Sequence, residues 1–192
     1  MSSAGPDSVR LARTSDVDDI ARVQVRAWRA SYAGILPPEV LESLDESDIA
    51  LEWGRALLRP GPDRLLVATD GSGAVVGAAS IGPSGDPDAG DDPALAPGEV
   101  GLFVIDPDAR RQGHGSRLLA ACVDLLVQGG HFEAVTWVPL ADEARRAFLQ
   151  SAGWGPDSAY RDLAVTDDAT VREVRIVSVL ADPPGEAGRP DS

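Results

Sequence analysis

The chain has 192 residues, 43% of them hydrophobic and 25% charged, a composition that suits one globular domain and excludes a fibrous or wholly disordered protein. Lys and Arg total 17 against 31 Asp and Glu, and a net charge of −14 disfavours binding to nucleic acid or to an anionic membrane. A single cysteine, Cys122, excludes an internal disulfide, and with only two histidines we expect no metal site. No segment reaches the roughly 20 apolar residues that span a bilayer, so we expect a soluble cytoplasmic protein.

Both ends of the chain are poor in large apolar residues. We therefore expect a flexible N-terminus over 1–8, one folded domain over 9–181 and a flexible C-terminal tail over 182–192. Inside the domain, the stretch 82–98 (GPSGDPDAGDDPALAPG) is rich in Gly, Pro and Asp and predicts a long surface loop between strands. Its acidic part, 86–92, could draw a cationic molecule toward a nearby pocket.

The first half of the domain starts with alternating residues at 9–14, which predict a short strand. The sequence SDVD that follows resembles a capping box and predicts a helix from about residue 15 to about 32. Two more predicted helices cover 38–45 and 46–58, and a Gly-rich turn (DGSG) joins predicted strands over 64–70 and 74–81 into a hairpin.

The second half alternates strands with helices. A nearly continuous apolar run at 98–106 predicts a strand buried on both faces. The remaining predicted elements are a helix at 116–128, a strand at 133–140, a helix at 142–154 and strands at about 159–165 and 172–180. This alternation predicts a mixed α/β fold.

A Gly-rich turn with two arginines, RRQGHGS at 110–116, lies between the strand at 98–106 and the helix that follows it. The first turn of a helix has unpaired backbone N–H groups and a positive dipole end, and glycines let a phosphate approach the backbone closely. The segment therefore predicts an anion site, although a tight strand-to-helix turn with solvated arginines would give the same pattern.

The spacing Arg110-x-x-Gly113-x-Gly115 resembles the pyrophosphate signature of the GNAT superfamily of acetyl-CoA-dependent N-acetyltransferases. Neighbouring segments agree in order. The segment 99–107 resembles the fourth strand of that family, and the segment 148–154 resembles its later helix, which ends in Gly-Phe. The likeness covers about residues 9–180.

The resemblance implies a mixed, mostly antiparallel sheet with splayed central strands, flanked by helices, and acetyl-CoA as cosubstrate. Phe103 and Ile105 would bind the pantetheine arm through backbone groups, and a backbone N–H, that of Ile105, would stabilise the oxyanion. The pyrophosphate would lie on the turn formed by Arg110, Arg111, Gln112, Gly113, His114, Gly115 and Ser116. Asp142 stands where the family often has an Asn that contacts the cofactor.

Acetyl transfer to an amine needs a group that removes the ammonium proton. Glu99, at the start of the central strand, is the candidate base, and the alternative is a strand-end carboxylate that meets only solvent. Trp28 and Tyr32 are candidate walls of a substrate pocket. The family's usual general acid is a Tyr, and Leu149 occupies its position here, so either Tyr160 or Tyr32 donates a proton or no acid is needed.

The leading hypothesis is an N-acetyltransferase that passes the acetyl group to a primary amine of a small molecule, peptide or protein by direct attack in a ternary complex. The alternative is a catalytically inactive acyl-CoA-binding or sensor module. A third hypothesis, a nucleotide or phosphate binder that uses the same helix N-terminus, predicts no tunnel for pantetheine between the strands. The resemblance also makes a homodimer reasonable.

Overall fold

The computed structural model describes residues 7–86 and 96–181. The predicted C-terminal tail, 182–192, lies outside these residues. So do residues 1–6 of the predicted N-terminal segment and residues 87–95 of the predicted 82–98 loop. No helix within the described ranges is long and apolar enough to cross a membrane. The same residues contain no group of three or more His, Cys, Asp or Glu side chains placed to hold a metal ion.

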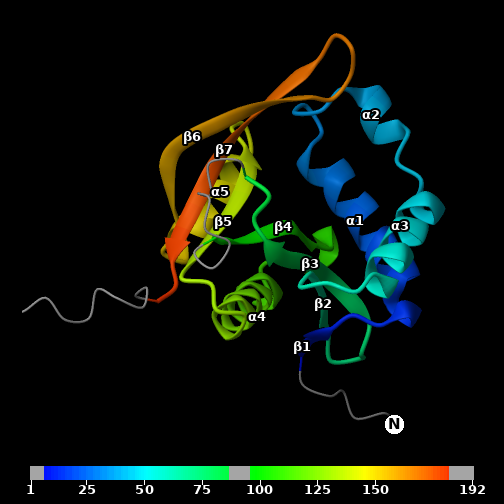
Figure 1. Cartoon of the computed structure of the whole chain (residues 1–192). Coiled ribbons are helices and arrows are strands. Elements are labelled where there is room, and N and C mark those ends of the chain that lie inside the picture. Colours follow the sequence, from blue (N-terminus) through cyan, green and yellow to red (C-terminus); the bar gives the residue numbers. More distant parts are fainter. Residues whose placement is uncertain (1–6, 87–95, 182–192) are drawn as a thin grey trace, which may run out of the picture.

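Seven strands form a single sheet in the order β1-β2-β3-β4-β5-β7-β6 (Figure 1). All neighbours are antiparallel except β4 and β5, which are parallel. The strands are β1 (Ser8–Leu11), β2 (Arg64–Thr69), β3 (Val75–Pro83), β4 (Gly98–Ile105), β5 (Glu133–Pro139), β6 (Gly155–Ala164) and β7 (Thr170–Val179). This sheet and its flanking helices confirm the predicted fold class.

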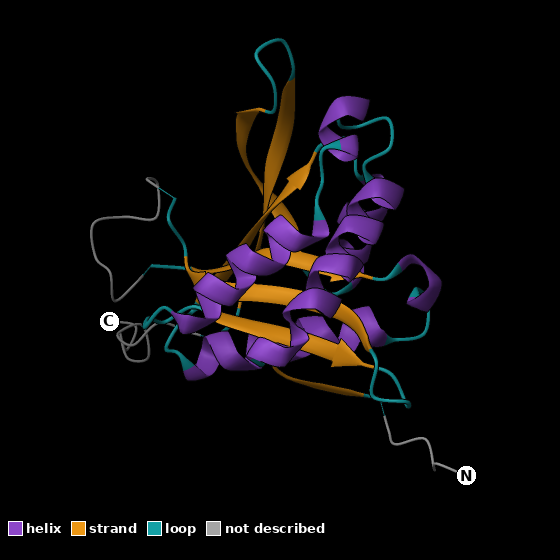
Figure 2. Ribbon diagram, turned by 90° about the vertical axis from the view of Figure 1, so that its right-hand side faces the viewer, coloured by secondary structure: helices purple, strands orange, loops and turns teal. Residues whose placement is uncertain are grey.

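Helices cover both faces of the sheet. They are α1 (Val17–Ser31), α2 (Pro38–Glu42), α3 (Glu46–Leu58), α4 (His114–Gln128) and α5 (Glu143–Ser151). Residues of α1 and α3 pack on one face, and residues of α4 and α5 pack on the other. The β6–β7 hairpin projects beyond the rest of the sheet (Figure 2).

The core lies on both faces of the central strands, as β2 illustrates. Leu65 and Val67 pack with the α1 side, whereas Leu66 and Ala68 pack with the α4 side, and all four are buried. The apolar runs of these strands follow from this double burial. Cys122 is buried in the part of the core on the α4 side of the sheet. Burial raises the pKa of its thiol to about 12, so it serves there as a small apolar residue.

Several predicted boundaries differ from the structure, and three of the differences have a local cause. A 3-10 turn, Thr14–Asp16, precedes α1, because the Asp16 carboxylate accepts a hydrogen bond from the Arg13 N–H at 2.7 Å. Helix α4 begins at His114, two residues early, since Gly113 takes the left-handed conformation directly before it. Strand β6 begins at Gly155, four residues early, because a bulge that includes Ser158, with φ of +76°, keeps Pro156 in the ladder.

Asp106, just after β4, ties α1 to the turn that leads into α4. Its carboxylate accepts hydrogen bonds from Arg26 Nε at 2.9 Å and from the Asp108 N–H at 3.0 Å, and only 7% of the residue is exposed. Burial alone would raise the pKa of Asp106, but the hydrogen bonds from Arg26 and Asp108 and the charges of Arg26 and Arg22 lower it below its ordinary value.

Asp106→Asn should lower the free energy of unfolding at pH 7 by about 1–2 kcal/mol, because it removes the charge from a hydrogen-bonded ion pair. The folded-state pKa lies below the unfolded value of about 3.9, so this stability is present above about pH 4 and lost as the pH falls through the folded pKa. Urea unfolding at pH 7 and at pH 3 measures both effects.

The matched control is Asp108→Asn, because Asp108 also contacts Arg26 but its side chain is 88% exposed. It should change the stability much less. A difference between wild type and Asp106→Asn that stays constant from pH 7 to pH 3 would contradict this account of Asp106.

Candidate functional site

Strands β4 and β5 separate almost as soon as they meet. The ladder between them contains two residue pairs, Gly98 with Ala134 and Glu99 with Val135. The next contact is a side-chain hydrogen bond, in which buried Thr136 donates from Oγ1 to the carbonyl oxygen of Val100 at 2.7 Å. The two strands therefore diverge after Glu99, in the splayed arrangement that the family resemblance implies.

A β-bulge turns β4 at the point of divergence. Two steps along β3, from Ala79 to Ile81, match three steps along β4, from Phe103 to Val100, so β4 carries one extra residue. The extra N–H is not lost, because Leu102 donates it to Ser80 Oγ at 2.8 Å. Strand β4 is thus divided into a part before the bulge, with Glu99, and a part after it, with Phe103 and Ile105.

Beyond the bulge, alternate residues of β4 direct their backbone groups to opposite sides. Leu102 and Asp106 donate toward β3, to Ser80 Oγ and to the Val76 carbonyl oxygen at 2.8 Å. Backbone direction alternates along a strand, so the N–H and C=O groups of Phe103 and Ile105 face away from β3, into the gap beside β5. These groups are free to bond an extended ligand as a strand would.

The Gly-rich turn has the backbone geometry of an anion site. Gly113 is the N-cap of α4 with φ of +83°, and Arg111 also has a positive φ, +62°. The first N–H groups of α4 have no intrahelical partner, and the helix dipole adds positive potential there. The conformation explains the glycine at 113, since an L side chain is strained at that φ.

A cavity of about 730 Å³ joins this turn to the second part of β4. Ten of the predicted site residues line it: Trp28, Tyr32, Phe103, Ile105, Arg110, Arg111, Gly113, Gly115, Ser116 and Asp142. Trp28 and Tyr32 therefore lie with the predicted cofactor residues and not with Glu99. Their rings are 6.0 Å apart.

Two residues of the turn, and Asp142, have local structural contacts. The His114 ring is buried with Nδ1 3.2 Å from an Arg117 nitrogen, and the Gln112 side chain donates to the Asp108 carbonyl oxygen at 3.1 Å. Neither His114 nor Gln112 lines the cavity. Asp142 lines it and also caps α5, since its Oδ1 accepts from the Arg145 N–H at 3.0 Å.

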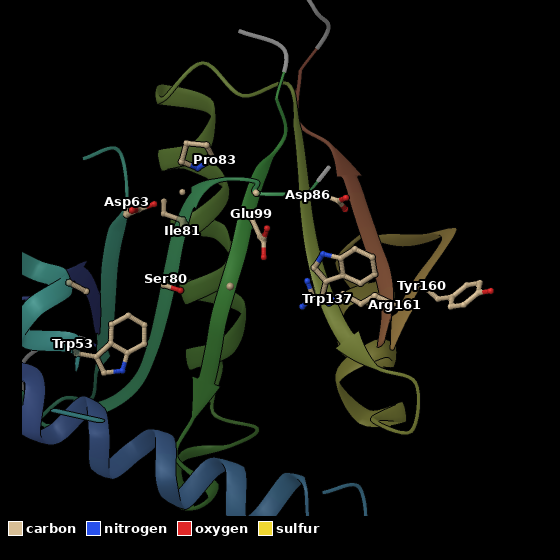
Figure 3. A pocket seen from close by; sticks show the side chains of 14 residues that line it. Trp53, Asp63, Ser80, Ile81, Pro83, Asp86, Glu99, Trp137, Tyr160 and Arg161 are labelled. Atoms are coloured by element: carbon tan, nitrogen blue, oxygen red, sulfur yellow. The ribbon is translucent and has the colours of Figure 1, made fainter. Parts of the chain in front are cut away.

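Glu99 belongs to a second cavity, of about 660 Å³, at the other end of β4. Its carboxylate is partly buried and accepts a hydrogen bond from Ser84 Oγ at 3.0 Å. In Figure 3 the Glu99 side chain lies between Asp63 on one side and Trp137 on the other. Trp53, Gly101 and Tyr160 also line this cavity.

The absence of a side chain at Gly82 makes room for Asp63 beside Glu99. A Cβ at position 82 would lie 2.1 Å from Asp63 Oδ1, closer than any real contact. Gly82 pairs with Glu99 across the ladder, and paired residues of antiparallel strands project to the same face. Two carboxylates therefore lie on one face of the sheet, in one cavity.

Trp137, from β5, forms the opposite wall and is held by two arginines. The guanidinium carbon of Arg161 lies 4.4 Å from the ring centre and that of Arg175 lies 5.8 Å from it. Arg175 also forms ion pairs with Asp157 at 2.8 Å and with Asp86 at 2.7 Å. Hydrogen bonds to Asp157 and Asp86, and the charges of both, raise the pKa of Arg175 although burial lowers it. The Asp86 pair links β7 to the segment after β3 and so spans the gap.

Sequence reasoning did not single out Asp63, Trp53 or Trp137 as functional residues. The signal for Asp63 is the glycine at position 82, which is informative only once Gly82 is known to face Glu99. The two tryptophans have no local signal that separates a cavity wall from a core residue.

The chain is similar in sequence to known acetyltransferases. The model of the Acetyltransferase (GNAT) family matches residues 23–154. The uncharacterised N-acetyltransferase YuaI of Bacillus subtilis is 34% identical over 131 residues, which are 68% of this chain and 70% of YuaI.

Solved structures share the fold at low sequence identity. PaiA N-acetyltransferase from Thermoplasma acidophilum, in complex with coenzyme A, aligns with a TM-score of 0.67 and 17% identity over 93% of this chain and 99% of that one. YncA from Salmonella typhimurium, with its cofactor acetyl-CoA, aligns with a TM-score of 0.66 and 20% identity over 98% and 99%. These matches confirm the resemblance and the fold class that the sequence predicts.

Gly113→Ala should weaken acetyl-CoA binding roughly tenfold. A non-glycine residue in the left-handed conformation costs about 1–2 kcal/mol, and a backbone shift that relieves this strain moves the N–H groups at the start of α4. Titration calorimetry measures the affinity. Gly73→Ala is the matched control, because Gly73 has φ of +88° in the turn before β3 and does not line the cavity. Equal affinities for wild type and Gly113→Ala would refute the anion site.

Proposed function

Because the chain belongs to the GNAT acetyltransferase family and is an acetyl-CoA-dependent N-acetyltransferase, we propose that it acetylates a cationic primary amine with an apolar or aromatic body, by direct attack in a ternary complex. The observation that carries this proposal is the pair of cavities on β4. One is lined by residues after the bulge, the other by Glu99 and Gly101, so both substrates can be bound at once.

The residues of the larger cavity fit acetyl-CoA. Unpaired backbone groups of Phe103 and Ile105 suit the amide groups of an extended pantetheine arm. The start of α4, with Arg110 and Arg111 beside it, suits the pyrophosphate. When bound, acetyl-CoA supplies the acetyl group as a thioester, and transfer forms the amide C–N bond, breaks the C–S bond and releases coenzyme A as the thiol.

The smaller cavity supports a cationic acceptor with an apolar body. Asp63 and Glu99 place negative charge on one face, and the acidic chain as a whole attracts cations. Trp53 and Tyr160 add aromatic surface, and Trp137 presents a further ring whose position is fixed by Arg161 and Arg175. A small amine or the amino group of a peptide meets these requirements.

Glu99 is the proposed general base. A protonated amine is not a nucleophile, so Glu99 removes one ammonium proton, directly or through a water molecule, before the nitrogen attacks the thioester carbonyl. Backbone N–H groups of β4 that face the gap, that of Ile105 among them, stabilise the negative charge on the carbonyl oxygen.

The fate of the leaving group follows from the position of Leu149. Leu149 is 3% exposed within the core and offers no proton. A thiol has a pKa of about 8.5, so the thiolate leaves readily and takes its proton from solvent, and we propose that no general acid is required. Homodimer formation and a cytoplasmic location stay predictions from the sequence.

Glu99→Gln should lower kcat by roughly 10²–10⁴ while the affinity for acetyl-CoA is kept, because the substitution removes the base without changing the cofactor cavity. Thiol release with a reactive amine measures kcat, and calorimetry measures the affinity. The matched control is Glu133→Gln, at the exposed start of β5 and outside both cavities. Wild-type turnover in Glu99→Gln would remove Glu99 from the mechanism.

Asp63→Asn should raise KM for a cationic amine roughly two- to fivefold with little change in kcat. The substitution removes one exposed negative charge that attracts the amine and takes no part in the chemical step. The rise should shrink at high salt, because salt screens the attraction in the wild type. Steady-state kinetics at two salt concentrations measure both effects. Asp18→Asn, an exposed change on α1, is the control. A selective loss of kcat in Asp63→Asn would contradict the proposed binding role.

A further inference from the structure

Arg145 extends from the first turn of α5 into the cofactor cavity without a charged partner. Its Nη1 donates to the Tyr32 hydroxyl oxygen at 3.3 Å, and its guanidinium carbon lies 6.0 Å from the Phe103 ring centre. Its Nε is buried and has no hydrogen-bond partner among the described residues. Arg145 therefore links α5 to α1 and β4 through weak contacts that leave part of its donor capacity unused.

Arg145 shares the lack of a carboxylate partner with the other arginines that line its cavity. Within the described chain, the arginines that form ion pairs of 2.6–3.0 Å all lie outside this cavity: Arg10, Arg22, Arg26, Arg117, Arg161, Arg172 and Arg175. Arg110, Arg111 and Arg145, which line the cofactor cavity, have no such ion pair within the described part of the chain. With 31 acidic residues against 17 arginines, three unpaired guanidinium groups in one cavity concentrate positive potential there.

We propose that Arg145 binds a phosphate group of the cofactor. A buried guanidinium donor without a partner is disfavoured, and a phosphate oxygen satisfies it with a charge-assisted hydrogen bond. The Arg145 side chain can leave Tyr32 and Phe103 at little cost in free energy, because only a hydrogen bond of 3.3 Å to a neutral hydroxyl and a distant ring contact hold it there. Coenzyme A carries a pyrophosphate and a 3′-phosphate, and either supplies the same chemistry.

This role is distinct from those of the Gly-rich turn and of Glu99. The turn between β4 and α4 offers backbone N–H groups. Arg145 instead reaches the same cavity with its side chain, from α5 on the other side of the gap between the strands. Cofactor binding through Arg145 would thus connect the two halves of the splayed sheet. The inference rests on acetyl-CoA binding and not on the identity of the amine.

The test compares Arg145→Met with Arg146→Met. Arg146 is the next residue of α5, its Nε is also buried without a partner in the described chain, and it does not line the cavity. Calorimetry with coenzyme A, 3′-dephospho-coenzyme A and pantetheine separates the phosphates from the pantetheine arm. Arg145→Met should weaken coenzyme A binding roughly 10- to 100-fold and leave pantetheine binding unchanged, and Arg146→Met should change neither.

The two phosphate sources give different patterns. If Arg145 binds the 3′-phosphate, Arg145→Met binds coenzyme A and its dephospho form equally, whereas a pyrophosphate contact lowers both affinities by the same factor. The salt dependence of coenzyme A binding should also fall in the variant. Equal losses for coenzyme A and pantetheine, or no loss, would overturn the proposal. If Arg145→Met does not fold, Arg145→Gln serves in its place, and Arg145→Lys should keep most of the affinity.

Discussion

The early separation of β4 from β5 is the constraint on which the rest of the molecule depends. Two ladder pairs and one buried side-chain bond, from Thr136 to the Val100 carbonyl oxygen, hold the strands together at one end. Beyond that point backbone groups of β4 have no strand partner, and unpaired backbone groups inside a protein are costly. A ligand that pairs with them would restore the missing bonds, which is why we propose this gap as the site of the pantetheine arm.

Charge is divided along the same strand. Guanidinium groups without ion-pair partners line the cavity after the bulge, and the carboxylates of Asp63 and Glu99 face the cavity before it. In the proposed function, this division attracts an anionic cofactor and a cationic amine to opposite ends of β4, which favours a productive arrangement of both. The Arg175 to Asp86 ion pair, with both side chains mostly buried, bridges the two sides of the sheet at the end that carries Glu99.

The sequence predicted the order of the elements and the Gly-rich turn before α4 because these depend on local patterns. Hydrophobic periodicity identifies the helices, and the glycine at 113 marks the position directly before α4 where the backbone takes a positive φ that favours glycine. The cavity of Glu99 depends on pairing between distant segments: the Asp63 carboxylate occupies the space that a side chain at position 82 would fill. For the same reason the sequence could not separate Trp28 and Tyr32, which line the cavity beside the Gly-rich turn, from Trp53 and Trp137, which line the cavity of Glu99.

The most direct test of the central claim is a crystal structure of the protein with coenzyme A. The account predicts phosphates at the start of α4, the pantetheine arm hydrogen-bonded to the backbone of Phe103 and Ile105, and the thiol at the bulge, directed toward the cavity of Glu99. A thiol directed away from that cavity, or a pantetheine arm outside the gap between β4 and β5, would contradict it.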